Sequence, residues 1–262
     1  MNTYANREAN ALAAAQHVRL LESNYSQEVS HSSKNTQIYT GPIAVAPQFH
    51  QSTVVELKAM DTVTALFDIS TVDCGRTCIL NFASYKNPGG KFLEGSMAQE
   101  EALCRRSTLY PVLQRHIDDY YQWNRSHLNR ALYMHRALYS KDILFFDFVT
   151  NYLADVLTCA APNNRAYSRY NVGPECEAYN LEALEERIKF VLDIAEISEV
   201  DTLLLGAWGC GVFGQNPYVV SELFFKYIPS HNIPRIVFAV PDYTSDNYRA
   251  FEHALYVHGE LL

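Results

Sequence analysis

Two adjacent carboxylates, Glu100 and Glu101, follow a turn with the sequence Pro88-Gly89-Gly90. Backbone N–H groups converge in such a turn, and the small glycines let a phosphate approach the main chain closely. Acidic residues at the start of a helix gain about 0.3–1 kcal/mol each from the helix dipole. Each feature alone is common in purely structural roles. Their combination on one strand–loop–helix unit indicates acid–base chemistry beside a phosphate-bearing ligand.

A second glycine-rich loop, Gly206–Gly214, directly follows an apolar segment. Its glycines can form a nest of backbone N–H groups that binds the diphosphate of a ligand. The loop lacks the Lys-Ser/Thr ending of a P-loop, so ATP hydrolysis is not indicated. Cys210 lies inside the loop, but no histidine in the sequence is evidently its partner. We therefore interpret Cys210 as a small residue that fits the loop, not as a nucleophile.

Strand-like and helical segments alternate from Thr53 onward. Strands are expected at 53–57, 77–81, 143–149, 155–160, 202–205 and 236–240, with a short one at 38–39. Helices are expected at about 11–25, 99–113, 181–195, 218–228 and 247–257, and the polar stretch 26–51 is expected to wrap the surface. Apolar strands that alternate with helices predict a sheet covered on both faces. Ligands bind such sheets in the loops beyond the carboxyl ends of the strands.

The amino-acid composition argues against several kinds of binding partner. The 262 residues carry a net charge of -8, which argues against an exposed nucleic-acid surface because such surfaces need clustered Lys and Arg. The six Cys form no CxxC pair and the nine His form no HExxH motif, so we expect reduced thiols, no metal and no cofactor. No signal peptide and no transmembrane run is apparent, so we expect a cytoplasmic protein with no membrane partner.

Five motifs in order resemble the bacterial-type poly(ADP-ribose) glycohydrolases, a branch of the macrodomain fold. The family signature is a triple-glycine loop followed by Gln-Glu-Glu, which here reads Gly89-Gly90-Lys91 and then Gln99-Glu100-Glu101. The other similar segments are 137–148, 157–163, 205–217 and 236–242. The resemblance implies a three-layer α/β/α macrodomain-like mixed sheet with an N-terminal helical extension. Residues 53–262 would form the glycohydrolase domain, and residues 1–52 the extension packed on it.

The resemblance also implies a hydrolase that cleaves ADP-ribosyl glycosidic bonds. In the family the second glutamate is the general acid and base, which corresponds to Glu101, while Glu100 would hold the hydroxyls of the scissile ribose. A buried acid near another carboxylate has a raised pKa, which suits proton donation near neutrality. Gln99 either orients Glu101 or only starts the helix. Asn81 and Asn87 flank the loop; Asn87 is the better candidate for a ribose contact, and its alternative role is to shape the turn.

The remaining ligand contacts are expected in the two glycine loops: Gly89, Gly90, Lys91, Gly209, Cys210, Gly211, Val212, Phe213 and Gly214. Phe213 would pack on a ribose, or else belong to the core. Lys91 replaces the third glycine of the signature and would either crowd the ligand or pair with a phosphate. Arg105 and Arg106 would either reach phosphates or lie on a solvated helix face, the latter being favoured.

The expected partners are ADP-ribose, poly(ADP-ribose) or an ADP-ribosylated protein, with the chain acting as a monomer. Two alternatives stay open. Lys91 and the divergent segment 118–136, which could form a lid over the far ribose, are compatible with removal of single ADP-ribose units from side chains such as arginine. A non-catalytic ADP-ribose reader is the other alternative, although relatives that only bind generally lack the paired glutamates.

Overall fold

A seven-stranded mixed sheet forms the centre of the computed structural model, which describes residues 3–45, 52–71, 74–146 and 150–259. In spatial order the strands are β1 (Gln37–Thr40), β4 (Arg136–Phe146), β5 (Asn151–Cys159), β3 (Thr77–Phe82), β6 (Thr202–Leu205), β7 (Arg235–Ala239) and β2 (Val54–Lys58). Strand β4 runs antiparallel to both of its neighbours. From β5 to β2 the pairs are parallel, so the carboxyl ends of these strands lie at one edge of the sheet.

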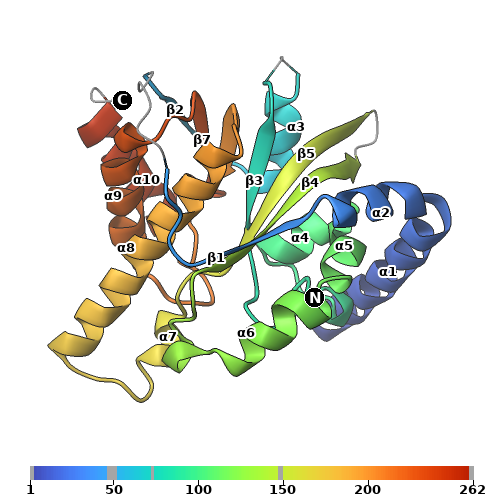
Figure 1. Cartoon of the computed structure of the whole chain (residues 1–262), viewed down its shortest axis with the longest axis horizontal. Helices are drawn as coiled ribbons and strands as arrows, with labels where there is room; N and C mark the ends of the chain where they lie inside the picture. The colour runs from blue at the N-terminus through green and yellow to red at the C-terminus, as the bar shows by residue number, and fades with distance from the viewer. Residues whose placement is uncertain (1–2, 46–51, 72–73, 147–149, 260–262) are drawn as a thin grey trace.

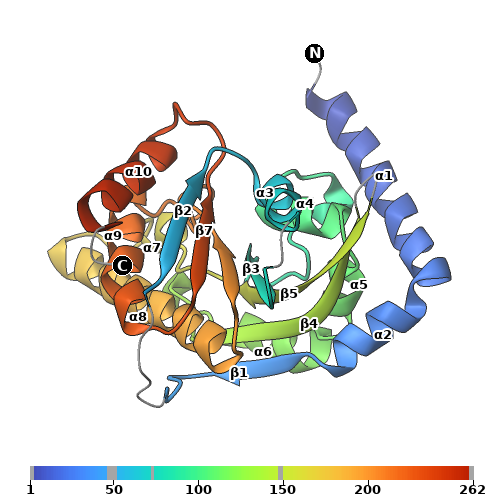
Figure 2. The ribbon, with the colours of Figure 1, turned by 90° about the horizontal axis from the view of Figure 1, so that it is seen from above.

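Helices cover both faces of this sheet (Figures 1 and 2). On one face lie α8 (Pro174–Ile197), α9 (Pro217–Tyr227) and α10 (Asp246–His258); on the other lie α3 (Thr62–Ile69), α4 (Gln99–Arg105), α5 (Leu109–Gln114), α1 (Thr3–Asn24) and α2 (Ser26–Lys34). Successive residues of a strand point to opposite faces. Accordingly, Leu203 and Leu205 pack with α8–α10, whereas Leu204 packs with α3–α5. The predicted three-layer α/β/α architecture is confirmed.

The strand predicted at 143–149 is the second half of a longer strand. Strand β4 begins at Arg136, and a register shift between Ser140 and Ile143 interrupts its pairing with β5. At this bulge Asp142 has a φ of 56° and its amide donates to Asp155 Oδ1 at 3.0 Å. The polar Lys141-Asp142 pair marks the bulge and not the strand's beginning. Residues 147–149 lie outside the described part of the chain.

The helix predicted at 99–113 is broken, and the stretch after residue 26 is partly helical. Ser107 forms a β-bridge with Phe145, and its hydroxyl donates to Leu103 O and accepts from Leu109 N, so α4 ends and α5 begins there. In 26–51, α2 buries Val29 beneath a polar outer face, so a helix that was not predicted forms part of this surface segment. Helix α3 was not predicted. Two short helices, α6 (Gln122–Ser126) and α7 (Asn164–Tyr167), complete the fold.

The N-terminal helices pack on the loop between the first glycine turn and α4. Arg7 donates from Nε to Glu94 O at 2.9 Å, and Asn10 donates to Gly95 O at 3.5 Å. Ala14 of α1 and Val29 of α2 are part of the same apolar core as α4 and α5. Helix α1 therefore supports the segment that carries Gln99, Glu100 and Glu101.

Candidate active site

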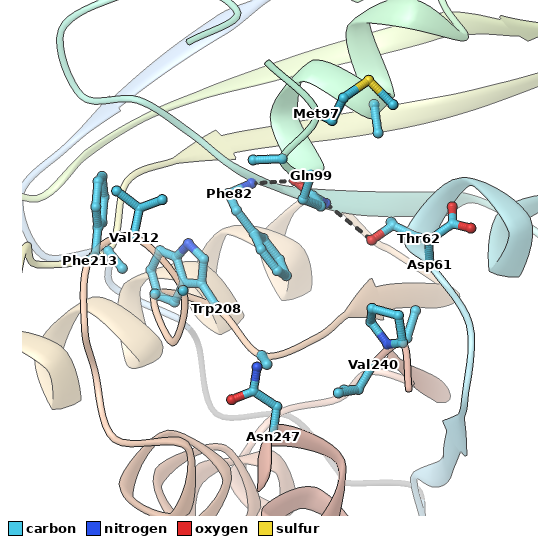
Figure 3. A pocket seen from close by; sticks show the side chains of 18 of the residues that line it. Asp61, Thr62, Phe82, Met97, Gln99, Trp208, Val212, Phe213, Val240 and Asn247 are labelled. Atoms are coloured by element: carbon cyan, nitrogen blue, oxygen red, sulfur yellow. Dashed lines mark hydrogen bonds between the residues drawn. The ribbon is translucent and has the colours of Figure 1, made fainter. Parts of the chain in front are cut away.

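Loops from the carboxyl ends of β2, β3, β5, β6 and β7 enclose a cavity of about 360 Å³ (Figure 3). It is lined by Asp61, Thr62, Val63, Phe82, Met97, Ala98, Gln99, Ala102, Ala161, Ala207, Trp208, Gly209, Gly211, Val212, Phe213, Ala239, Val240, Pro241 and Asn247. Its volume and its largely apolar lining with a few polar groups are typical of a small-molecule site. The location is the one that parallel strands predict.

Aromatic and aliphatic side chains form most of the cavity wall. Figure 3 shows Phe82, Trp208, Phe213 and Val240 around the space, with the Asn247 amide at one side. Trp208 is fully buried, and its indole N–H donates to Cys159 O at 3.2 Å. The Trp208 ring is therefore held rigidly at the cavity wall.

The first glycine turn lies directly against the two carboxylates. Gly89 and Gly90 have φ of 67° and 60°, in the left-handed region that favours glycine. A Cβ on Gly90 would lie 2.6 Å from Glu101 Oε1 and 3.0 Å from Glu100 Oε2. No larger residue fits here unless the carboxylates move.

Glu100 is buried, and hydrogen bonds engage both of its oxygens. Ser84 N donates to Oε2 at 2.7 Å, and Asn81 Nδ2 donates to Oε1 at 3.4 Å and also to Thr158 Oγ1 at 3.2 Å. Burial raises the pKa of Glu100 to about 8; the Ser84 amide opposes this shift and the neighbouring Glu101 charge adds to it. Glu100 therefore retains its proton near neutral pH.

Glu101 is held by only one oxygen. Its Oε1 accepts from Lys91 N at 2.8 Å, whereas its Oε2 is buried and has no hydrogen-bond partner among the described residues. A buried carboxylate oxygen without a partner is costly, and it is the kind of group that a ligand or water satisfies. Neither glutamate lines the cavity itself; the pair lies beside it, beneath the Gly90 turn.

Gln99 joins the start of α4 to the end of β3. Its side-chain oxygen accepts from Phe82 N at 2.8 Å, and its Nε2 donates to Leu80 O at 2.9 Å and to Thr62 Oγ1 at 3.3 Å (Figure 3). Ala98, the N-cap of α4, provides no side-chain cap. Gln99 therefore fixes the first turn of α4, and with it the two glutamates that follow, while its side chain lines the cavity.

Asn87 and Lys91 do not reach the cavity with their side chains. Asn87 is exposed; its main chain forms the turn by donating to Ser84 Oγ at 3.2 Å and accepting from Gly90 N at 3.0 Å. Lys91 has a φ of -113°, so its backbone does not require glycine. Its ammonium is exposed and lies 3.7 Å from Glu94 Oε2. The side chain of Lys91 thus crowds neither the turn nor the cavity.

The second glycine loop supplies the opposite wall of the cavity through Gly209, Gly211, Val212 and Phe213. Phe213 lines the cavity and also lies edge-on to Tyr133 with ring centroids 6.1 Å apart, and its packing on a ribose stays a prediction. Cys210 and Gly214 belong to this loop but are not part of the cavity lining; Gly214 packs against Arg165 instead. Burial raises the pKa of the Cys210 thiol to about 12, so the thiolate required for a nucleophile is scarce near neutrality.

Segment 118–136 supports the first glycine loop from behind. Asn124 is buried and donates to Tyr85 O at 2.9 Å, while Tyr85 OH donates to His127 O at 3.0 Å. Within the described chain no residue of 118–136 contributes to the cavity lining, and a lid over the far ribose stays a prediction. Tyr133 stacks on Tyr85 with centroids 4.2 Å apart.

Arg105 and Arg106 bind main-chain oxygens. Arg105 donates to Ser96 O at 3.2 Å, and Arg106 donates from Nε to Phe146 O at 3.0 Å. Neither arginine lines the cavity. Both are half-buried, so they are neither phosphate contacts of this cavity nor a fully solvated helix face.

Sequence reasoning missed the part of the cavity that precedes α3. Asp61 caps α3 by accepting from Val63 N and Thr64 N, and Thr62 accepts from Gln99. The signal was present in Asp61-Thr62, since Asp is a favoured N-cap after a strand. Trp208 was also missed.

Among the residues that the structure describes, no helix combines the length and the apolar character that are needed to span a bilayer. No three His, Cys, Asp or Glu side chains within that part of the chain gather as the ligands of a metal ion would.

Comparisons with known proteins place this site in a family. Residues 8–147 match the family described as microbial-type PARG, catalytic domain. Poly(ADP-ribose) glycohydrolase (PARG) from Thermomonospora curvata bound to the inhibitor ADP-HPD is 28% identical, with a TM-score of 0.80 over 94% of this chain and 99% of that one. PARG from Deinococcus radiodurans in complex with ADP-ribose is 30% identical, with a TM-score of 0.76 over 87% of this chain and 97% of that one. No curated protein matches. The chain therefore belongs to the microbial-type PARG catalytic-domain family, and it is a macrodomain-like glycosidase that hydrolyses ADP-ribosyl linkages.

Proposed function

We propose that this chain releases ADP-ribose from poly(ADP-ribose), with Glu101 as the general acid and base. The observation that carries the proposal is the state of Glu101: one oxygen is fixed by Lys91 N, and the other is buried beside the cavity without a partner in the described part of the chain. A proton carrier needs a fixed position and one oxygen that is free to meet the substrate. Glu100, whose two oxygens are both engaged, is less suited to this role.

The reaction follows from the chemistry of a glycosidic bond. Glu101 in its acid form donates a proton to the leaving oxygen while the ribose gains oxocarbenium character. The C–O bond breaks, and the leaving hydroxyl departs with that proton. The Glu101 carboxylate then takes a proton from a water molecule as the water oxygen bonds to the anomeric carbon, which restores the acid. No covalent intermediate or metal ion is required.

Glu100 and Asn81 would position the ribose. A protonated Glu100 can donate to a ribose hydroxyl, and its raised pKa of about 8 keeps that proton available near neutrality. The buried Oδ1 of Asn81 has no partner among the described residues and can accept from a second hydroxyl. Two groups with opposite hydrogen-bonding roles would fix the sugar relative to Glu101.

The rest of the ligand would occupy the cavity. Its apolar wall, which includes Phe82 and Val240, suits the faces of an adenine base, and the main chain of Gly209–Phe213 suits the diphosphate. The solved PARG relatives in complex with ADP-ribose or ADP-HPD support this assignment. The side chain of Lys91 is exposed. Lysine in place of the third glycine of the signature therefore does not block the ligand in this arrangement.

Defined substrates test the proposal. Incubation of the purified chain with poly(ADP-ribose), with arginine-linked ADP-ribose and with serine-linked ADP-ribose should release ADP-ribose from the polymer, as measured by chromatography. Release from a single-unit substrate alone would assign the activity to mono-ADP-ribosyl removal. Tight calorimetric binding of ADP-ribose without any product would identify the chain as a reader and overturn the proposal.

A further inference from the structure

Arg187, on the sheet-facing side of α8, has a guanidinium that is only 1% exposed. Its Nε donates to His135 Nδ1 at 3.0 Å, its Nη1 to Ala160 O at 2.6 Å and its Nη2 to Leu132 O at 3.2 Å. All three acceptors are neutral groups: burial and the adjacent Arg187 charge lower the pKa of His135 to about 4.

No carboxylate of the described chain forms an ion pair with Arg187. The ionisable groups around it include Cys159, Tyr85 and Tyr120, and the adjacent Glu186 instead binds Lys189 at 2.6 Å. An arginine stays protonated in proteins even when burial opposes its charge. Fully buried arginines without an anionic partner are rare because the charge loses its hydration. The fold therefore retains a permanent positive charge that no acidic residue of the described chain balances.

This charge lies directly behind the cavity wall. Ala160, which accepts from Arg187, is followed by Ala161, which lines the cavity. On the other side of Ala161 is the second glycine loop: a Cβ on Gly209 would lie 2.9 Å from the Ala161 Cβ. The segment Ala160–Ala161 thus contacts the guanidinium through the Ala160 carbonyl and the loop proposed to bind the diphosphate through the Ala161 side chain.

Arg187 also supports the main chain next to Tyr133, an aromatic residue near the cavity. Leu132, its second carbonyl acceptor, lies in a run in which Asn129, Arg130, Ala131 and Tyr133 all have positive φ. Such a backbone is strained and persists only where its surroundings hold it. Removing Arg187 would therefore disturb packing as well as charge, and a test must separate the two effects.

We infer that Arg187 is a buried counter-charge for the diphosphate of the ligand and thereby sets the preference of the site for a charged nucleotide over a neutral nucleoside. The inference rests on the proposed function, because it takes the anion to be ADP-ribose. A charge in a low-dielectric wall acts on a nearby anion more strongly than a solvated charge does. The missing partner of Arg187 is then the ligand itself.

Glutamate and glutamine are nearly equal in size, so placing each of them at His135 separates the effect of the Arg187 charge from the effect of packing. In His135→Glu the new carboxylate lies beside Arg187 and neutralises its charge, while the guanidinium stays in position. His135→Gln keeps a neutral hydrogen-bond acceptor at the same place. Calorimetry with ADP-ribose should show affinity lowered about tenfold by His135→Glu, the size expected for one charge acting through a protein wall, and unchanged by His135→Gln. Adenosine, which lacks phosphates, should bind all three proteins equally.

Further variants and outcomes make the test decisive. His253→Glu makes the same charge change at an exposed position of α10 and should leave both affinities unaltered. Arg187→Lys should retain more ADP-ribose affinity than Arg187→Met, measured on protein whose folding is checked by circular dichroism. Equal ADP-ribose affinity of His135→Glu and His135→Gln, or equal weakening of adenosine and ADP-ribose by His135→Glu, would overturn the inference alone. Failure of the unaltered chain to bind ADP-ribose would overturn the proposed function, and the inference with it.

Discussion

Glu100 and Glu101 are neighbours in sequence, yet the fold gives them different surroundings. Glu100 lies against β3, where Ser84 N and Asn81 hold both oxygens, whereas Glu101 faces the glycine turn with one oxygen that no described residue contacts by a hydrogen bond. Pairs of acids that are placed in unlike environments divide catalytic labour in many glycosidases. The division follows from the first turn of α4, which points successive side chains in different directions.

Replacing Glu101 by Gln should abolish turnover but not binding. The amide keeps the size of the side chain but cannot donate and regain a proton, so the rate of ADP-ribose release should fall by about 10²–10⁴-fold. Calorimetry should still detect ADP-ribose binding. Glu252→Gln, an exposed change on α10, is the matched control and should retain full activity. Normal release by the Glu101 variant would refute the assignment.

Glu100 should make the fold less stable as the pH rises. Its folded pKa of about 8 lies above the reference value of 4.5, so between these pH values the unfolded chain loses a proton that the folded chain retains. Stability therefore falls across this window, by at most about 1.4 kcal/mol per pH unit. Urea unfolding at pH 5 and pH 8 should show a loss in the unaltered chain that is smaller in Glu100→Gln. Equal losses in the two proteins would contradict the raised pKa.

At the scale of elements, the glycine turn and the start of α4 form one unit. Gly90→Ala would place a Cβ 2.6 Å from Glu101 Oε1, so the carboxylate must move. A displacement of this order can lower turnover about 100-fold. Gly41→Ala is the control: Gly41 also has a positive φ, of 75°, but a Cβ there meets nothing within 4 Å. Gly90→Ala should lose more stability than Gly41→Ala in thermal unfolding, because only its Cβ meets the carboxylates, and only Gly90→Ala should lose activity. Similar activity of the Gly90→Ala and Gly41→Ala variants would show that the geometry of the glycine turn does not determine turnover.

The elements that sequence reasoning identified are those whose local pattern is undisturbed. The strand at 202–205 matches β6 in both bounds because its leucines are buried on both faces of the sheet. The helix at 99–113 was wrong because the break depends on a bridge between Ser107 and Phe145, a contact across the chain that no local pattern reveals. The role of Gln99 depends likewise on Phe82 N and Leu80 O, which only the folded sheet brings into reach.

At the scale of the whole molecule, the site is assembled from loops that are remote in sequence. The two glycine loops were recognisable because glycine and its spacing have local meaning. The cavity wall from Thr62, Trp208 and Val240 was not recognised, because a helix start after the Asp61 N-cap and two apolar residues acquire a common role only when the parallel strands bring their loops together. The buried charge of Arg187 was also missed: its spacing from Leu184 and Val191 places it on the apolar face of α8, but its carbonyl acceptors come from segments remote in sequence.

Ligand binding should stabilise the entire fold, and Gly211 offers a way to prevent it without altering the core. ADP-ribose at about 100 times its Kd should add about 2.7 kcal/mol to the free energy of unfolding and raise Tm by several degrees. A Cβ on Gly211 meets nothing within 4 Å, and Gly211 lines the cavity. Gly211→Phe should therefore fold normally and yet lose the ligand-dependent rise in Tm, because its ring occupies the space of the ligand. Gly211→Ala should keep the rise. A full rise in the phenylalanine variant would mean that ADP-ribose binds outside this cavity.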